Sequence, residues 1–195
     1  MSVLVTAFGP FNGRLENASS LVLKELKRTF PKIRTRILAV DSVIAPARLK
    51  QALRSIRPES LIMLGEAAGS KKIRLETTAW NELDFRIPDI AGRLVTARPI
   101  RKNSPASLRS TLPLEQIYEL LDAAGHQVSY SDDPGRYLCN QLFYAALDHL
   151  KRQSIVIPAG FIHLPLENEC STTSATDAIS RIIQMLTHPP GESPA

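Results

Sequence analysis

Cys139 is the residue best placed to act as a nucleophile in this 195-residue chain, which has one other cysteine, Cys170, in a polar loop. Cys139 falls in the first turn of a helix predicted over residues 137–150, directly after a predicted turn. The partial positive charge of a helix N-terminus stabilises a thiolate, the reactive form of cysteine. A free cysteine beside a stripe of leucines is also a common small buried residue, so position alone leaves catalysis and packing both open.

A cysteine nucleophile needs a general base, and the chain offers four histidines. His188 falls in the C-terminal tail, His149 on the polar face of a helix, and His126 after a glycine that ends a helix. His163 ends the segment 155–164, which we expect to be a strand followed by a loop at the ligand-binding edge of a sheet. His163 is therefore the candidate base, although a histidine satisfied by a backbone carbonyl fits the same pattern.

A third group must orient the imidazole, and Glu76 is the candidate because it interrupts the apolar and threonine-rich segment 73–79. Strand alternation puts Glu76 on the same face as Arg74 and Thr78, which is the pattern of an acid that faces solvent. The sequence pattern therefore leaves a catalytic and a solvent-facing role open.

The sequence carries no motif that would indicate a metal or nucleotide site. It has no CxxC, no HExxH and no pair of histidines at helical spacing. The glycine-bearing segments 9–13 and 65–69 match neither a P-loop nor GxGxxG. We expect no metal and no nucleotide cofactor.

Alternating strands and helices must position these residues. The patterns of apolar residues predict strands at 2–8, 33–40, 61–64, 73–81, 127–130 and 154–157, and helices at 18–30, 46–57, 114–124, 137–150 and 173–186. This order favours an α/β layered fold with mainly parallel strands, whose ligands bind beyond the carboxyl ends of the strands. The loops at Gly9 and Gly65 would lie at that edge.

The remaining segments suggest one domain, over residues 1–187, and a flexible C-terminal tail, over residues 188–195. Residues 85–113 are polar and contain several prolines, so we expect a long loop there with a short strand at 94–97.

Composition excludes several classes of protein. The net charge of +5 comes from scattered basic residues, which does not favour a nucleic-acid partner. No run of about 18 apolar residues could span a membrane. Two cysteines cannot form a disulfide framework, and the first residues lack the pattern of a signal peptide, so we expect a cytoplasmic protein.

Four blocks of the chain resemble the pyroglutamyl peptidase I (pyrrolidone-carboxylate peptidase) family of cytosolic cysteine peptidases. In chain order they are VLVTAFGPFNG (3–13), LETTAWNELDFRIPDIAG (75–92), GRYLCNQLFYAAL (135–147) and AGFIHLPLE (159–167). The resemblance implies that Cys139 is the nucleophile, His163 the general base and acid, and Glu76 the group that orients His163.

The same resemblance implies the substrate and the fold. Phe8 and Phe11 match an aromatic pair that packs on the pyrrolidone ring, and Arg86 matches an arginine near the site that helps to stabilise the oxyanion. The implied reaction removes an N-terminal pyroglutamyl residue from a peptide without a cofactor. The implied fold is a three-layer α/β/α sandwich with a mixed, mainly parallel sheet, in a homo-oligomer such as a dimer or tetramer.

The chain departs from the family pattern around the expected pocket. Glu66 stands where the family usually has a glutamine that recognises the lactam, and Asn12 and Trp80 are also unusual. Two alternatives therefore stay open: a catalytically weak relative that binds a ligand or a partner, and a transferase of the nucleoside phosphorylase kind. The transferase would need an anion-binding loop, and the sequence shows none.

Overall fold

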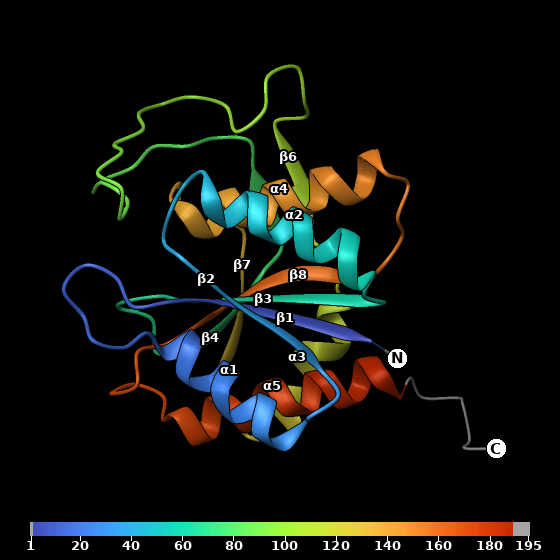
Figure 1. Ribbon diagram of the computed structural model, residues 1–195. Helices are drawn as coiled ribbons and strands as arrows, with labels where there is room; N and C mark the ends of the chain where they lie inside the picture. Colours follow the sequence, from blue (N-terminus) through green and yellow to red (C-terminus); the bar gives the residue numbers. More distant parts are fainter. Residues whose placement is uncertain (1, 189–195) are drawn as a thin grey trace.

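The computed structural model describes residues 2–188, whose central element is a six-stranded sheet (Figure 1). Across the sheet the strands are β2 (Arg34–Leu38), β1 (Val3–Phe8), β3 (Ser60–Glu66), β8 (Ala159–Leu164), β4 (Ile73–Glu76) and β7 (Val128–Ser131). All neighbours are parallel except β4 and β8, which are antiparallel. The predicted mixed, mainly parallel sheet is confirmed.

Helices cover both faces of this sheet and complete the three-layer α/β/α sandwich (Figure 1). One face packs against α2 (Ile44–Ile56) and α4 (Leu138–Arg152), and the other against α1 (Ala18–Thr29), α3 (Leu114–Ala123) and α5 (Thr172–Thr187). Two side chains cap these helices as expected from their residue types: Asn17 accepts from the Ser19 N–H, and Ser171 accepts from the Ser174 N–H.

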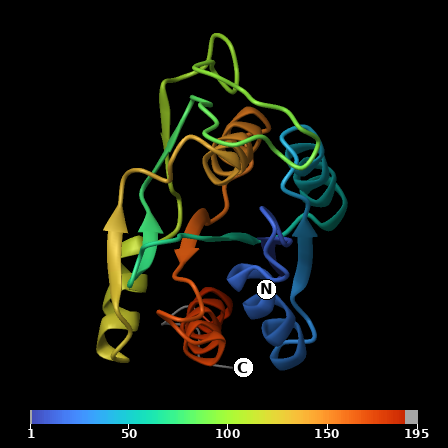
Figure 2. The same ribbon diagram turned by 90° about the vertical axis from the view of Figure 1, so that its left-hand side faces the viewer.

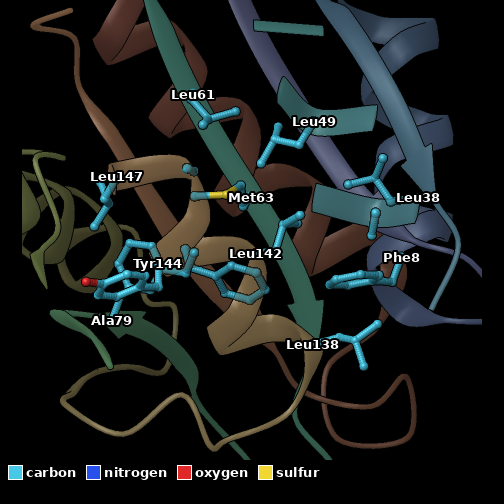
Figure 3. Packing of buried hydrophobic residues seen from close by; sticks show 14 of the residues in the cluster. Phe8, Leu38, Leu49, Leu61, Met63, Ala79, Leu138, Leu142, Tyr144 and Leu147 are labelled. Atoms are coloured by element: carbon cyan, nitrogen blue, oxygen red, sulfur yellow. The ribbon is translucent and has the colours of Figure 1, made fainter. Parts of the chain in front are cut away.

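Side chains alternate between the two faces, which is what decides where the functional residues point. On β1, Leu4 and Phe8 join the core beneath α2 and α4, whereas Val3, Val5 and Ala7 join the core above α1 and α5. Figure 3 shows part of the first core, including Phe8 and Leu138 at the start of α4. Every residue of β1 is buried, so this strand is covered on both faces.

The same alternation brings the predicted site residues to one face. On β8, Phe161 belongs to the core under α4 while Ile162 and Leu164 belong to the opposite core, so His163 faces α4. On β4, Leu75 belongs to the opposite core, so Glu76 also faces α4. The sheet therefore presents His163 and Glu76 to the helix that carries Cys139.

The strand predicted over 73–81 is in fact two strands. It divides at Thr77, after which β5 (Thr78–Trp80) leaves the sheet and pairs with β6 (Ser107–Arg109). The prediction of a strand at 94–97 is wrong, since none of these residues belongs to a strand and the isolated bridge nearby joins Leu83 to Arg98. The strand of this region is the short β6, which the apolar pattern did not indicate.

The prediction of a strand at 154–157 is also wrong. Ser154 has a φ of +54°, and Ile155 and Val156 are exposed, Val156 at 96%. Pairing with β3 begins only where the Leu61 N–H donates to Pro158 O. The strand is therefore β8, and His163 lies within this strand rather than in a loop.

His149 was expected on the polar face of its helix, but this residue is buried, with 7% of its surface exposed. Beyond His188, the predicted tail lies outside the described residues.

Candidate active site

Cys139 is the second residue of α4, at the helix end that faces the carboxyl end of β3. No side chain caps this N-terminus. The first amide hydrogens of a helix have no partner inside it, so those of Leu138, Cys139 and Asn140 are the ones that can bind an anion formed beside Sγ. The Gln141 N–H already donates to Tyr137 O.

Gly65 leaves the space that the Cys139 side chain uses. A β-carbon at position 65 would lie 3.0 Å from the Cys139 Sγ and 2.7 Å from the Phe161 ring. Neither gap accommodates a methyl group, so only glycine fits between the thiol and the sheet. The sequence indicated Gly65 only as a loop residue at the functional edge, and this close approach was missed.

His163 and Glu76 form a buried pair next to Cys139. The His163 Nδ1 lies 2.7 Å from the Glu76 Oε1, and the two residues are 5% and 0% exposed. Cys139 lies close enough to His163 to act on its pKa, and because Nδ1 is engaged by Glu76, Nε2 is the nitrogen left for the thiol. The Arg74 Nε lies 3.4 Å from the Glu76 Oε1. The structure therefore brings Cys139, His163 and Glu76 together.

This arrangement favours a charged imidazole. Burial by itself lowers the pKa of His163, but the charge of Cys139 and hydrogen bonding of the charged imidazole to Cys139 and Glu76 outweigh burial and raise that pKa to about 9. His163 therefore carries its second proton at neutral pH. A protonated imidazole beside a thiol can support a thiolate and later supply a proton to a leaving group.

A cavity of about 330 Å³ opens beside Cys139. Its wall combines aromatic and aliphatic side chains with charged ones; the lining residues include Phe8, Phe11, Ile87, Tyr137, Leu138, Arg14, Glu16 and Glu66. The predicted pair Phe8 and Phe11 is thus found at the cavity, with Phe8 3% exposed. A cavity of this size and lining suits a small, flat and mostly apolar group.

Tyr137 belongs to the cavity wall and was missed by sequence reasoning. Its ring lies 5.7 Å from that of Phe11 and packs edge-on against Phe85 at 4.7 Å, measured between centroids. Its hydroxyl donates to Pro88 O, and burial raises its pKa. The sequence pattern indicated Tyr137 only as the first residue of a helix, because nothing near it in the sequence predicts its contacts with Phe11, Phe85 and Pro88.

An ionic network with two buried carboxylates, Asp41 and Asp89, fastens the 85–113 segment beside the cavity. Asp89 accepts hydrogen bonds from the Ser42 N–H at 2.9 Å and the Ser42 hydroxyl at 2.7 Å, and pairs with Arg93. Arg93 also pairs with Asp41. Burial opposes the charge on Asp89, but the hydrogen bonds from Ser42 and Arg93 outweigh it and hold the pKa of Asp89 far below its usual range.

The fastened segment covers α4, as Figure 2 shows in green and yellow-green. Near the network the Ile90 N–H donates to Val40 O, and the Gln141 amide donates to Ser42 O. Ile87, two residues before Asp89, lines the cavity. The segment that the sequence marked as an irregular loop is therefore part of the wall of the site.

The two remaining predicted residues are placed differently. Glu66 lines the cavity, pairs with Arg14 and accepts a hydrogen bond from the Ala18 N–H at 2.9 Å. Arg86 is exposed and is not among the residues that line the cavity, although its neighbour Ile87 is. The role of Arg86 in stabilising an oxyanion stays a prediction.

Within residues 2–188, no group of three or more His, Cys, Asp and Glu side chains could hold a metal ion, and no helix of this part is long and apolar enough to cross a membrane. The groups that the site brings together are a thiol, an imidazole and a carboxylate. In this α/β/α frame, such a chain of groups defines a cysteine-dependent hydrolase.

Comparison with known proteins places the chain within that class. The model of the family described as pyroglutamyl peptidase matches residues 1–185, and the chain belongs to this family. A pyrrolidone-carboxylate peptidase of Vibrio vulnificus is 34% identical over 195 residues, covering 95% of this chain and 87% of the relative. One from Pyrococcus furiosus is 35% identical over 168 residues, covering 85% and 81%.

Solved structures agree with the family assignment. Crystal structures of the pyrrolidone carboxyl peptidase from Pyrococcus furiosus superpose with a TM-score of 0.90 at 29% identity, covering 96% of this chain and 98% of that chain. The architecture described above is therefore the architecture of these peptidases.

Proposed function

We propose that this protein is a cysteine peptidase that removes an N-terminal pyroglutamyl residue from peptides. The observation that carries the proposal is the chain of contacts from Cys139 to His163 to Glu76, placed beside a small cavity. The family membership and the names of the relatives support the same substrate.

Acylation begins with the Cys139 thiolate, which attacks the carbonyl carbon of the pyroglutamyl residue. The amide hydrogens at the start of α4, including that of Cys139, donate to the oxyanion that develops. Protonated His163 then gives its Nε2 proton to the departing amine, and a thioester remains on Cys139. Glu76 keeps His163 oriented through Nδ1 throughout this step.

Deacylation reverses the role of the imidazole. His163, now neutral, takes a proton from a water molecule that attacks the thioester. The pyroglutamate leaves, and the proton on His163 restores the starting pair with the Cys139 thiolate. The two steps need no group beyond those of the chain and water.

Recognition of the ring falls to the cavity wall. Phe8 and Phe11 supply apolar surface for a flat neutral ring. We propose that Glu66 accepts a hydrogen bond from the ring N–H, because an ionised carboxylate only accepts and its two oxygens keep lone pairs beyond those used by Arg14 and Ala18.

The test is hydrolysis of a fluorogenic pyroglutamyl amide, beside the matched prolyl and alanyl amides, before and after treatment with a thiol alkylator. We expect release from the pyroglutamyl substrate alone, and its loss on alkylation. The same samples incubated with a nucleoside and phosphate should show no phosphorolysis. A fully folded, unalkylated protein that binds the pyroglutamyl amide without cleaving it would support the alternative of a silent ligand-binding relative.

Cellular location and assembly remain proposals. We infer a cytoplasmic, homo-oligomeric enzyme, dimer or tetramer, from the resemblance and from the sparse use of cysteine. Light scattering at several protein concentrations measures the assembly directly, and a single monomeric mass at all of them would contradict it.

A further inference from the structure

The Arg14 guanidinium occupies a position in the cavity wall that neither the motif blocks nor the catalytic chain explains. It lines the cavity that contains Cys139 and pairs with Glu66 across 52 residues of sequence. The turn that places it closes through a hydrogen bond from the Arg14 N–H to Phe11 O, with Asn12 and Gly13 at positive φ. One short turn thus supplies both an aromatic ring and a cation to the wall.

Glu66 fixes the direction of this cation. Its Oε1 accepts from the Arg14 Nη1 while its Oε2 accepts from the Ala18 N–H at the start of α1. The Glu66 side chain is only 13% exposed, whereas that of Arg14 is 45% exposed. Among the described residues, no further side-chain partner of the guanidinium is found, so most of its five N–H donors remain available for a ligand.

The proposed substrate needs such a donor. A pyrrolidone ring presents one N–H donor and one C=O acceptor side by side on the same edge. Glu66 as a carboxylate can satisfy the N–H but repels the carbonyl oxygen, so the carbonyl requires a donor from another side chain. Arg14 is the cation held directly against Glu66, and a hydrogen bond from a charged donor is stronger than one from a neutral donor.

We propose that Arg14 is a specificity-determining residue that donates a hydrogen bond to the ring carbonyl of the substrate, with Glu66 as the residue that holds it in place. This inference rests on the proposed function for the identity of the ring. The pair of Arg14 and Glu66 offers a lactam one hydrogen-bond donor and one acceptor. It should therefore bind five-membered rings that carry a carbonyl more tightly than rings that lack one.

The test measures binding without turnover, in a Cys139→Ala background, by NMR titration of the full chain. Three amides of equal ring size are compared: pyroglutamamide has the ring N–H and C=O, 3-oxocyclopentanecarboxamide keeps only the C=O, and cyclopentanecarboxamide has neither. Each is titrated against chains with Arg14, Arg14→Met, Arg14→Lys and the control Arg28→Met, which removes an arginine that does not line the cavity.

We expect Arg14→Met to weaken binding of both carbonyl-containing amides about tenfold, and to leave cyclopentanecarboxamide within about twofold, because a charged hydrogen bond is lost only where a carbonyl was present. Arg14→Lys should retain part of the affinity, and Arg28→Met all of it. Equal weakening of all three amides would mean that Arg14 only supports the turn, and would overturn the proposal.

The proposal is also overturned if Arg14→Met leaves all three affinities unchanged, or if the parent chain binds pyroglutamamide no better than cyclopentanecarboxamide. Should Arg14→Met unfold, the ratio of affinities for the carbonyl and non-carbonyl rings in Arg14→Lys decides instead, and an unchanged ratio refutes a directed hydrogen bond. Turnover of a fluorogenic pyroglutamyl amide by chains that retain Cys139 separates the two claims. If the chain cleaves the pyroglutamyl amide but the substitutions of Arg14 do not change ring binding, this inference alone is rejected. If Arg14 affects ring binding as expected but the chain does not cleave the amide, the proposed function alone is rejected.

Discussion

Glu76 and His163 lie diagonally across the one antiparallel pair of the central sheet. His163 is directly opposite Arg74, and Glu76 is opposite Phe161, two residues farther along. The diagonal spacing lets the Glu76 carboxylate reach the His163 Nδ1 at 2.7 Å while Arg74 stays within 3.4 Å of the same oxygen. Because β4 and β7 run opposite to the other four strands, the antiparallel contact of β4 with β8 is what places the acid beside the imidazole.

Substitution of this pair should lower turnover by unequal amounts. We expect His163→Ala to reduce kcat by about 10²- to 10⁴-fold, because it removes the proton-transfer group, and Glu76→Gln to reduce it less, because an amide still orients the ring. Steady-state kinetics with a fluorogenic pyroglutamyl amide measures both. Near-normal turnover by a His163→Ala chain with an unchanged circular dichroism spectrum would refute the catalytic chain.

The pH profile should report the charge of His163. Because the pKa of His163 is raised to about 9, its proton is present at neutral pH and is lost as the pH rises through that value. We expect kcat/KM to fall on the alkaline side near pH 9. Glu76 helps to raise this pKa, so Glu76→Gln should move the alkaline limb to lower pH. A limb that stays in place, or moves to higher pH, would contradict the assignment.

Cys139 should react with iodoacetamide much faster than Cys170. Both thiols are partly exposed, so accessibility does not separate them, but only Cys139 has a protonated imidazole beside it. Peptide mapping by mass spectrometry after brief labelling gives the two rates. His163→Ala should slow the labelling of Cys139 and leave Cys170 unchanged; equal slowing at both sites would point to a global effect instead.

A methyl group at position 65 should damage catalysis more than binding. Gly65→Ala places a β-carbon 3.0 Å from the Cys139 Sγ and 2.7 Å from Phe161, so the thiol must shift. Displacement of a reacting atom by about 1 Å can cost about 10²-fold, and we expect a loss of this size in kcat. Gly9→Ala is the matched control, since its β-carbon would meet neighbours at 3.7 Å and 3.8 Å, an ordinary contact. Comparable losses in the two variants would argue against the crowding at Gly65.

Loss of the Asp89 carboxylate should loosen the 85–113 segment. Asp89→Asn removes a buried charge that accepts from Ser42 and Arg93, and we expect it to lower the free energy of unfolding by about 2–3 kcal/mol. The depressed pKa of Asp89 means that this contribution is present above its unfolded-state pKa of about 4 and is lost as the pH falls further. Urea unfolding at pH 7 and below pH 4 checks both points.

The exposed Asp84 of the same region supplies the control for Asp89. Asp84→Asn should change the free energy of unfolding by no more than about 0.5 kcal/mol. An Asp89→Asn chain as stable as Asp84→Asn at pH 7 would show that the network does not secure the segment. Faster proteolysis within residues 85–113 of the Asp89→Asn chain alone would support it.

The sheet, the helices and the placement of Cys139 at a helix start follow from local patterns. Alternation also put Glu76 and Arg74 on one face correctly, but the pattern could not say that this face is covered by α4 rather than by water. That cover depends on contacts between segments far apart in the chain. Ile155 and Val156 led to a wrong strand prediction because both are strand-forming residue types. They are exposed in the structure, where they follow Ser154 in a left-handed conformation.

The ionic contacts of the site were beyond sequence reasoning for a similar reason. Ser42 and Asp89 are 47 residues apart, and Arg14 and Glu66 are 52 apart, so no short motif links them. Glu66 was recognised as an unusual residue, but its partner was not, because a lone arginine in a loop carries no signal of what it will face.

Trapping of the acyl-enzyme tests directly whether Cys139 is the nucleophile. The protein is mixed with a pyroglutamyl ester or amide, quenched in acid within its first turnovers, digested and analysed by mass spectrometry. We expect the peptide containing Cys139 to carry the mass of one pyroglutamyl group and the peptide containing Cys170 to carry none. Cys139→Ala should show neither adduct nor turnover. Hydrolysis of the pyroglutamyl substrate by Cys139→Ala at the normal rate, with no adduct on Cys139 in the unsubstituted chain, would contradict it.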